Sequence, residues 1–211
     1  MSQNIKRQVA EALLDHEAVI IRNEDWFTWA SGIKSPIYCD NRQLMSYPKA
    51  RKLVAQALAD MIKEKYPNVT CIAGTATAGI PHAAWVSEIL DLPMVYVRSK
   101  AKDHGRQSQI EGHLDADDQV VLIDDLISTG GSVLEACQPV AKECSVIGVA
   151  AIFTYELDRA KKNFQVADIP LAVLSDFHSL LEVAKEKHDF SQADMDNILD
   201  WHRQLNQSSN E

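Results

Sequence analysis

Two adjacent aspartates, Asp124 and Asp125, stand between four apolar residues and a run of small ones in the segment VVLIDDLISTGGS, residues 120–132. The apolar run 120–123 predicts a buried strand, with both acids where the strand leaves the sheet. Small residues allow backbone N–H groups to approach a ligand, and the helix expected over about 133–142 places a partial positive charge at its N-terminus. The segment therefore predicts a phosphate-binding turn at the carboxyl end of a parallel strand. It has neither the Walker A nor the GxGxxG spacing.

Two carboxylates beside an anion site would repel a phosphate unless another group of the ligand interacts with them. Mg²⁺ would resolve the conflict, because it binds through one or two carboxylates together with substrate oxygens. Alternatively, the acids accept hydrogen bonds from the neutral hydroxyls of a sugar. Both interpretations indicate a sugar phosphate as ligand. The competing structural interpretation is a helix-capping acid in an ordinary turn at a strand end.

A second candidate segment is a cluster of cations. Four of the 21 Lys and Arg residues fall within nine positions and are joined by a histidine: Arg98, Lys100, Lys102, His104 and Arg106. Gly105 and Gly112 supply hinges, and no apolar side chain fixes the middle of the segment. We therefore predict a mobile cationic lid over about 99–112. A solvated charge run is the alternative.

Two other segments carry weaker signals. Residues 74–82, GTATAGIPH, form a small-residue loop that would bind phosphate oxygens through backbone amides or would simply make a tight turn. Residues 27–40, FTWASGIKSPIYCD, combine aromatic and turn residues. They would form either a hood over a planar ligand or a local hydrophobic mini-core.

Elements that could position these segments follow from apolar periodicity. A first amphipathic helix is expected on the spacing of Ile5, Val9, Ala12 and Leu13. Residues 19–45 indicate irregular strands and turns. A second helix should begin near Ser46 as its N-cap, with a proline just inside.

Farther along, short apolar strands alternate with helices. Strands are expected at 69–73, 94–97, 120–123, 146–153 and 171–174. Residues 158–164 should form a short helix or a turn, and helices are expected at 177–187 and 191–205 among others. The polar stretch 99–118 has no apolar periodicity. Such alternation is typical of an α/β protein whose parallel sheet is covered on both faces.

Composition limits the class of protein. The 211 residues are 46% hydrophobic and 24% charged, as expected of one soluble globular domain over 1–211. A net charge of −9 argues against nucleic acid or an anionic membrane surface as partner. The N-terminal segment lacks the apolar core of a secretory signal, and the four cysteines lack zinc-site spacing. We therefore expect a cytoplasmic protein.

The segment 120–132 resembles the phosphoribosyl pyrophosphate (PRPP) motif of type I phosphoribosyltransferases. The lid sequence KAKDHG followed by IEG, and the segment FTWASGIKSPIYCDNR, are more specific and resemble the orotate phosphoribosyltransferase family. The similarity extends over almost the whole chain. It implies a type I phosphoribosyltransferase-like parallel sheet flanked by helices, with a small N-terminal hood formed mainly by about 19–45. A fused second enzyme is not expected in a chain of this length.

The resemblance also implies an activity and a set of site residues. The reaction would transfer phosphoribose from PRPP to orotate, giving orotidine 5′-phosphate and pyrophosphate, in pyrimidine synthesis. Asp124 and Asp125 would hold the ribose hydroxyls and, with Lys102, form the catalytic set. The residues that would wrap the 5-phosphate are Leu126, Ile127, Ser128, Thr129, Gly130, Gly131 and Ser132. Ser128 would also lie near orotate, together with Arg159.

The lid and the assembly follow from the same resemblance. Arg98, Lys102 and His104 would close on pyrophosphate, with Arg98 and Lys102 reaching the neighbouring subunit's site in a homodimer. Mg²⁺ would be the cofactor, held mainly by substrate oxygens rather than by a direct protein ligand.

The chain departs from some family members at three places. Ser99 follows the first lid arginine instead of Lys, Ala30 precedes the N-terminal Ser-Gly instead of Lys, and Thr77-Ala78 replaces Tyr-Lys. Two alternatives remain at this stage. One is a purine phosphoribosyltransferase, and the other is a regulator that senses the donor without catalysis.

Overall fold

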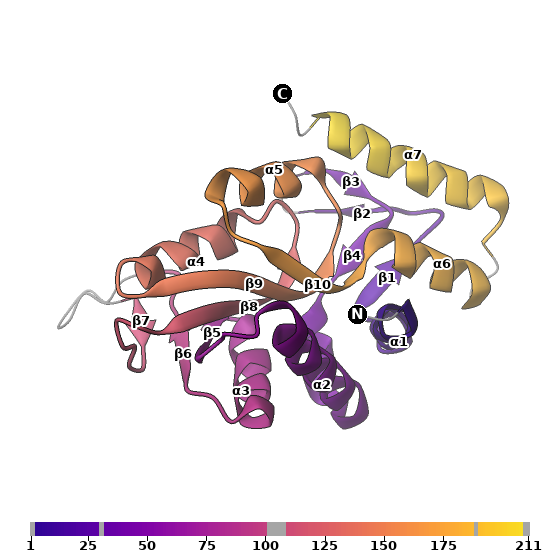
Figure 1. Ribbon diagram of the computed structural model, residues 1–211. Coiled ribbons are helices and arrows are strands. Elements are labelled where there is room, and N and C mark those ends of the chain that lie inside the picture. The colour runs from indigo at the N-terminus through magenta and orange to yellow at the C-terminus, as the bar shows by residue number, and fades with distance from the viewer. Residues whose placement is uncertain (1–2, 30–31, 101–108, 188–189, 209–211) are drawn as a thin grey trace.

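A six-stranded sheet forms the centre of the computed structural model, which describes residues 3–29, 32–100, 109–187 and 190–208 (Figure 1). The strands stand in the order β10-β9-β8-β5-β6-β7. They are β5 (Cys71–Thr75), β6 (Met94–Val97), β7 (Ile110–Glu111), β8 (Gln119–Ile127), β9 (Ser145–Thr154) and β10 (Leu171–Asp176). All neighbours pair in parallel except β6 and β7, which are antiparallel. The α/β class with a largely parallel sheet is confirmed.

Helices cover both faces of this sheet (Figure 1). One side carries α1 (Gln3–Asp15), α2 (Pro48–Lys65) and α3 (Gly79–Leu90), and the other carries α4 (Gly131–Ala141) and α5 (Asp158–Ala167). The C-terminal helices are α6 (Phe177–Lys187) and α7 (Gln192–Ser208). Because side chains alternate along a strand, successive residues of β8 enter different cores: Val121 and Ile123 pack into one, Leu122 into the other.

The hood consists of short antiparallel pairs. β1 (Val19–Ile21) pairs with β4 (Ile37–Cys39), β2 (Phe27–Thr28) pairs with β3 (Lys34–Ser35), and a 3₁₀ turn, η1 (Asn41–Ser46), follows. This agrees with the predicted irregular strands and turns.

The hood is fixed to the C-terminal helix. The ring of Trp29 lies 5.4 Å from that of Tyr155 and 5.8 Å from that of Trp201. The indole N–H of Trp201 donates to the carbonyl of Lys34 at 2.8 Å. The hood and α7 are therefore joined by a shared aromatic cluster.

The predicted start of the second helix is wrong. Ser46 is not the N-cap of the second helix: it ends the 3₁₀ turn, and α2 begins at Pro48 with Tyr47 as N-cap. Proline is suited to this first position because its missing N–H would have no helical partner there. The polar stretch after β6 also contains a strand, β7, whose two residues are too few to produce a periodic signal.

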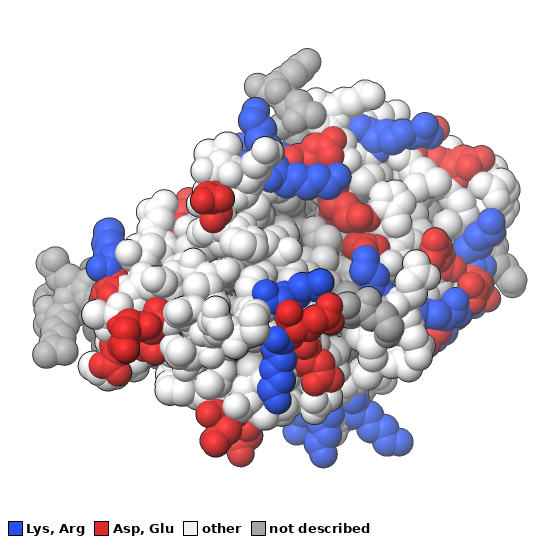
Figure 2. All heavy atoms as spheres, viewed as in Figure 1, with Lys and Arg blue, Asp and Glu red and all other residues white. Residues whose placement is uncertain are grey.

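Acidic and basic side chains are interspersed on the face shown in Figure 2. Within the described ranges, none of the helices combines the length and apolar character that a membrane span requires.

Candidate active site

The acidic pair lies inside strand β8, not after it. β8 continues to Ile127 because β9 remains paired with it, through Asp124 opposite Ala151 and Leu126 opposite Phe153. The prediction that the acids follow the strand is therefore wrong. Asp124 is 8% exposed and Asp125 is partly buried. The longer strand holds both carboxylates on rigid backbone at the carboxyl edge of the sheet.

The carboxylate of Asp124 is held by two donors. The hydroxyl of Thr75, at the end of neighbouring β5, lies 2.8 Å from Asp124 Oδ1, and the backbone N–H of Asp125 donates to the same oxygen at 2.9 Å. Thr75 Oγ1 also lies 3.1 Å from the carbonyl oxygen of Ile123. These bonds orient the Asp124 side chain.

Both aspartates resist ionisation. Burial raises the pKa of Asp124, and burial together with the charge of Asp124 raises the pKa of Asp125 to about 7. The positive charge of Arg42, on η1, opposes the second shift in part. A cationic or hydroxyl-rich ligand would relieve this unfavourable charge.

We expect the raised pKa of Asp125 to make the unliganded protein less stable as the pH rises. Between the ordinary value of 3.8 and about 7 the folded chain binds more protons at Asp125 than the unfolded chain does. The contribution of this group to stability is therefore complete below pH 4 and is lost as the pH rises through 7. The stability of Asp125→Asn relative to the wild type should therefore be greater at pH 8 than at pH 5. The expected difference is roughly 2 kcal/mol in the free energy of unfolding, or about 4–8 °C in Tm.

Thermal melts of both proteins at the two pH values measure this effect. Comparing the two proteins removes the opposing contribution of other groups, such as His82, whose pKa burial lowers to about 4. An Asp125→Asn effect that is the same at pH 5 and pH 8 would contradict the raised pKa.

The turn after β8 has the form expected of a phosphate-binding loop. Gly130 has φ 76°, in the left-handed region, and a Cβ there would lie 2.6 Å from the ring of Phe164 on α5. Asn163, also on α5, donates from Nδ2 to the carbonyl of Thr129 at 2.9 Å. Helix α5 therefore holds the turn in place from outside.

Helix α4 begins at Gly131, two residues earlier than predicted. Its first backbone N–H groups thus belong to the turn itself, as an anion site requires. Ser128 and Ser132 are exposed, and Leu126 and Ile127 belong to β8, with the side chain of Ile127 buried in the core. The small-residue turn that can surround a phosphate is therefore 128–132.

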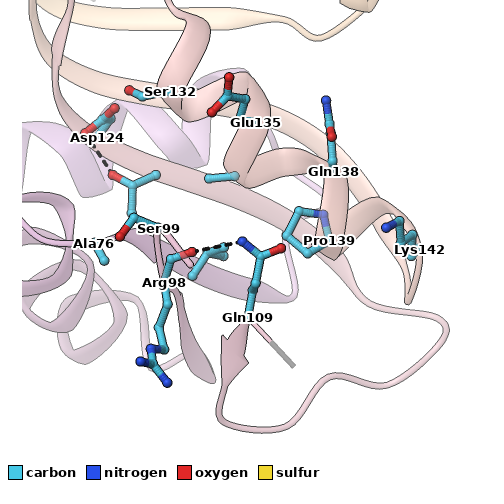
Figure 3. Close-up of a pocket in the computed structure, with 13 residues that line it drawn as sticks. Ala76, Arg98, Ser99, Gln109, Asp124, Ser132, Glu135, Gln138, Pro139 and Lys142 are labelled. Atoms are coloured by element: carbon cyan, nitrogen blue, oxygen red, sulfur yellow. Dashed lines mark hydrogen bonds between the residues drawn. The ribbon is translucent and has the colours of Figure 1, made fainter. Parts of the chain in front are cut away.

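A polar cavity of about 460 Å³ opens beside this turn (Figure 3). Asp124 and Ser132 lie at one end of it and Lys142 at the other. Its lining residues are Thr75, Ala76, Val97, Arg98, Ser99, Gln109, Asp124, Ser132, Glu135, Ala136, Gln138, Pro139 and Lys142. The cavity thus joins Asp124, the start of α4 and the base of the predicted lid.

Arg98 and Gln109, on either side of the predicted lid, are hydrogen-bonded to each other. The backbone N–H of Arg98 donates to the carbonyl of Gln109 at 2.8 Å, and Gln109 Nε2 donates back to the carbonyl of Arg98 at 3.3 Å. The Arg98 guanidinium lies 3.5 Å from Glu111 and points away from Asp124 (Figure 3). Lys102 and His104 lie outside the described residues.

Glycine is required where α3 starts. A Cβ on Gly79 would lie 2.2 Å from the carbonyl oxygen of Ile123 and 2.6 Å from Thr75 Oγ1. The loop before it, which includes a cis peptide between Ala76 and Thr77, reaches the cavity at Ala76. The segment 74–82 therefore contributes both backbone and the Thr75 side chain to the candidate site.

Asn41 joins the hood to the acidic strand. Its side chain is fully buried, and Nδ2 donates to the carbonyl of Asp125 at 2.6 Å. Its Oδ1 accepts from the thiol of Cys39 at 3.3 Å. Arg159 is exposed on the first turn of α5. Thr75 and Asn41 were not predicted as site residues, since only their partners in space give them a role.

The acidic end of the cavity fits a magnesium ion carried by the substrate. Asp124 and Glu135 offer carboxylate oxygens there, but the described ranges contain no cluster of three metal-binding side chains. Mg²⁺ commonly uses one or two carboxylates and completes its shell with phosphate oxygens and water. The donor set suits that arrangement.

Comparisons with known proteins agree with this geometry. The family of the phosphoribosyl transferase domain matches residues 41–184. The orotate phosphoribosyltransferase of Fusobacterium nucleatum is 53% identical over 204 residues, which cover 95% of this chain and 97% of that protein. The chain belongs to the orotate phosphoribosyltransferase family. The predicted family is thereby confirmed.

Solved structures confirm the phosphoribosyltransferase-like fold. The UMP synthase of Leishmania donovani superposes with a TM-score of 0.79 at 27% identity, over 96% of this chain and 43% of that longer one. The orotate phosphoribosyltransferase of Aeropyrum pernix gives a TM-score of 0.74 at 24% identity, over 84% of this chain and 98% of that one. The core of the orotate phosphoribosyltransferase fold therefore accounts for nearly all of the chain.

Proposed function

We propose that this chain transfers phosphoribose from PRPP to orotate, giving orotidine 5′-phosphate and pyrophosphate, in pyrimidine synthesis. One observation carries the proposal: in a chain of the orotate phosphoribosyltransferase family, Ser132, at the end of the glycine turn, and the buried Asp124 line one polar cavity. The purine phosphoribosyltransferase alternative is disfavoured by 53% identity to an orotate enzyme.

The proposed mechanism depends on the charges that develop during the reaction. As pyrophosphate leaves, C1 of the ribose gains positive character and the leaving group gains negative charge. Asp124 and Asp125 accept hydrogen bonds from the ribose hydroxyls, and backbone N–H groups of 128–132 hold the 5-phosphate. Arg98, Lys102 and His104 stabilise the departing pyrophosphate, which is electrostatic catalysis without a covalent intermediate. When bound, Mg²⁺ neutralises part of the pyrophosphate charge.

The experiment is a turnover assay with purified protein, PRPP, Mg²⁺ and either orotate or a panel of purine bases. We expect orotate to be consumed only when PRPP is present, and less without Mg²⁺. Turnover of a purine instead of orotate would support the purine alternative. PRPP binding without any turnover would support the donor-sensing regulator.

We further propose a homodimer in which Arg98 and Lys102 serve the partner subunit's site while the acids serve their own. The Arg98 guanidinium points away from Asp124 of its own subunit, which supports this arrangement (Figure 3). We also propose a cytoplasmic location, supported by four cysteines that are all free thiols.

The shared site leads to a complementation prediction. Lys102→Ala and Asp125→Ala should each be inactive alone, yet active when expressed together. In a mixed dimer one site inherits both defects and the other neither. Random pairing makes half of the dimers mixed, so activity should return to roughly a quarter of wild type.

Two different affinity tags allow the mixed dimer to be isolated, and it should then have about half of the wild-type activity. Two co-expressed copies of the same variant, purified through the same tags, are the control. A mixed dimer as inactive as the controls would show that the lid closes over its own subunit.

A further inference from the structure

We propose that Thr75 is a positioning residue: its hydroxyl holds the carboxylate of Asp124 in the orientation that receives the PRPP ribose. The proposal rests on the proposed function, which identifies the ligand. Thr75 itself lies at the end of β5, on the strand next to the acidic one.

The contacts favour Asp124 as the acceptor of the Thr75 proton. Thr75 Oγ1 lies 2.8 Å from Asp124 Oδ1 and 3.1 Å from the carbonyl oxygen of Ile123. A hydroxyl has one proton to donate, and a carboxylate is the stronger and here the closer acceptor. With the N–H of Asp125 on the same oxygen, rotation of the carboxylate about Cβ–Cγ is restrained from two directions.

The hydroxyl is itself fixed by packing. Thr75 is 6% exposed, and a Cβ on Gly79 would lie only 2.6 Å from its oxygen. Three elements therefore meet at this hydroxyl: the end of β5, the first turn of α3 and strand β8. A side chain confined in this way cannot turn elsewhere when a ligand arrives, so the orientation of Asp124 is set before binding.

A matched pair at the opposite end of the same two strands separates this role from stability. There the hydroxyl of Thr70 donates to Asp118 Oδ1 at 2.7 Å and accepts from the N–H of Gln119 at 2.9 Å. The chemistry is the same threonine–aspartate bond between β5 and β8. The pair precedes both strands, however, and lies outside the cavity.

The experiment compares Thr75→Val, which removes the hydroxyl but keeps the shape, with Thr75→Ser, which keeps the hydroxyl, and with Thr70→Val. Thr75→Val should raise KM for PRPP about 10- to 100-fold, because a hydrogen bond to a charged group is lost. KM for orotate should change less than twofold. Thr75→Ser should restore KM for PRPP to within a few-fold of wild type, and Thr70→Val should leave it unchanged.

Calorimetric titration with PRPP and Mg²⁺ provides a readout that needs no turnover. In an Asp124→Ala background, Thr75→Val should weaken PRPP binding no further, because its effect is transmitted through that carboxylate. Thr75→Ala replaces Thr75→Val if the latter does not fold. Equal loss of binding in both backgrounds, or a wild-type KM for PRPP in folded Thr75→Val, would overturn the proposal. An inactive wild-type protein would instead refute the proposed function.

Discussion

Replacing orotate by uracil is expected to lower kcat/KM about 10⁴-fold, because a site built to hydrogen-bond a substrate group rejects an analogue that lacks it. The two bases differ by one carboxylate. In a protein with a net charge of −9, that carboxylate needs local donors, such as backbone amides of the hood or a nearby cation. Without it those donors are left unpaired in a desolvated site, which adds to the loss.

The measurement is kcat/KM for both bases at saturating PRPP. Arg159→Ala tests the predicted cation at the start of α5. Arg203→Ala, an exposed arginine on α7 next to Asp200, is the matched control and should keep full discrimination. Comparable kcat/KM values for uracil and orotate in the wild type would refute carboxylate recognition.

Asp125→Asn is expected to lower turnover about 10²- to 10³-fold, the usual cost of removing one group that stabilises a transition state electrostatically. The fold should not suffer. Burial and the negative charge of the neighbouring Asp124 make the ionised form of Asp125 unfavourable, and its pKa is raised to about 7. Neutralising Asp125 relieves that repulsion, so Tm at neutral pH should rise.

Asp118→Asn is the control for this variant. Asp118 accepts from the hydroxyl of Thr70 and from the N–H of Asp115, at the other end of β8. Its loss should lower Tm and leave turnover intact, the reverse of the Asp125→Asn result. Near-wild-type turnover in Asp125→Asn would exclude a role of that carboxylate in the reaction.

Much of the fold could be predicted because buried strands and helices leave apolar patterns in the chain. The strand at 94–97 and the helix at 177–187 agree with β6 and α6 residue by residue. The length of β8 could not be predicted, since polar residues usually end an apolar run. Here the strand continues through two acids because β9 remains beside it.

The candidate site also contains residues that could be predicted from the sequence and residues that could not. The acidic pair and the glycine turn are recognisable because they are contiguous in sequence. Thr75 and Asn41 are not, because their partners lie 49 and 84 residues away. A threonine at a strand end is common, and only the position of Asp124 on the neighbouring strand gives it a role. The predicted roles of Lys102 and His104 remain predictions.

The tryptophan contact between the hood and α7 also affects the order in which the chain can fold while it is being translated. Trp29 is translated early, whereas its partner Trp201 comes 172 residues later, after every strand of the sheet. A nascent chain that has reached the end of α5 already contains the acidic strand, the glycine turn and the helix that supports it. The acidic strand and the glycine turn, which we propose to bind PRPP, can thus assemble while the chain is still being translated. The aromatic cluster shared by the hood and α7 can form only after the last helix has been made.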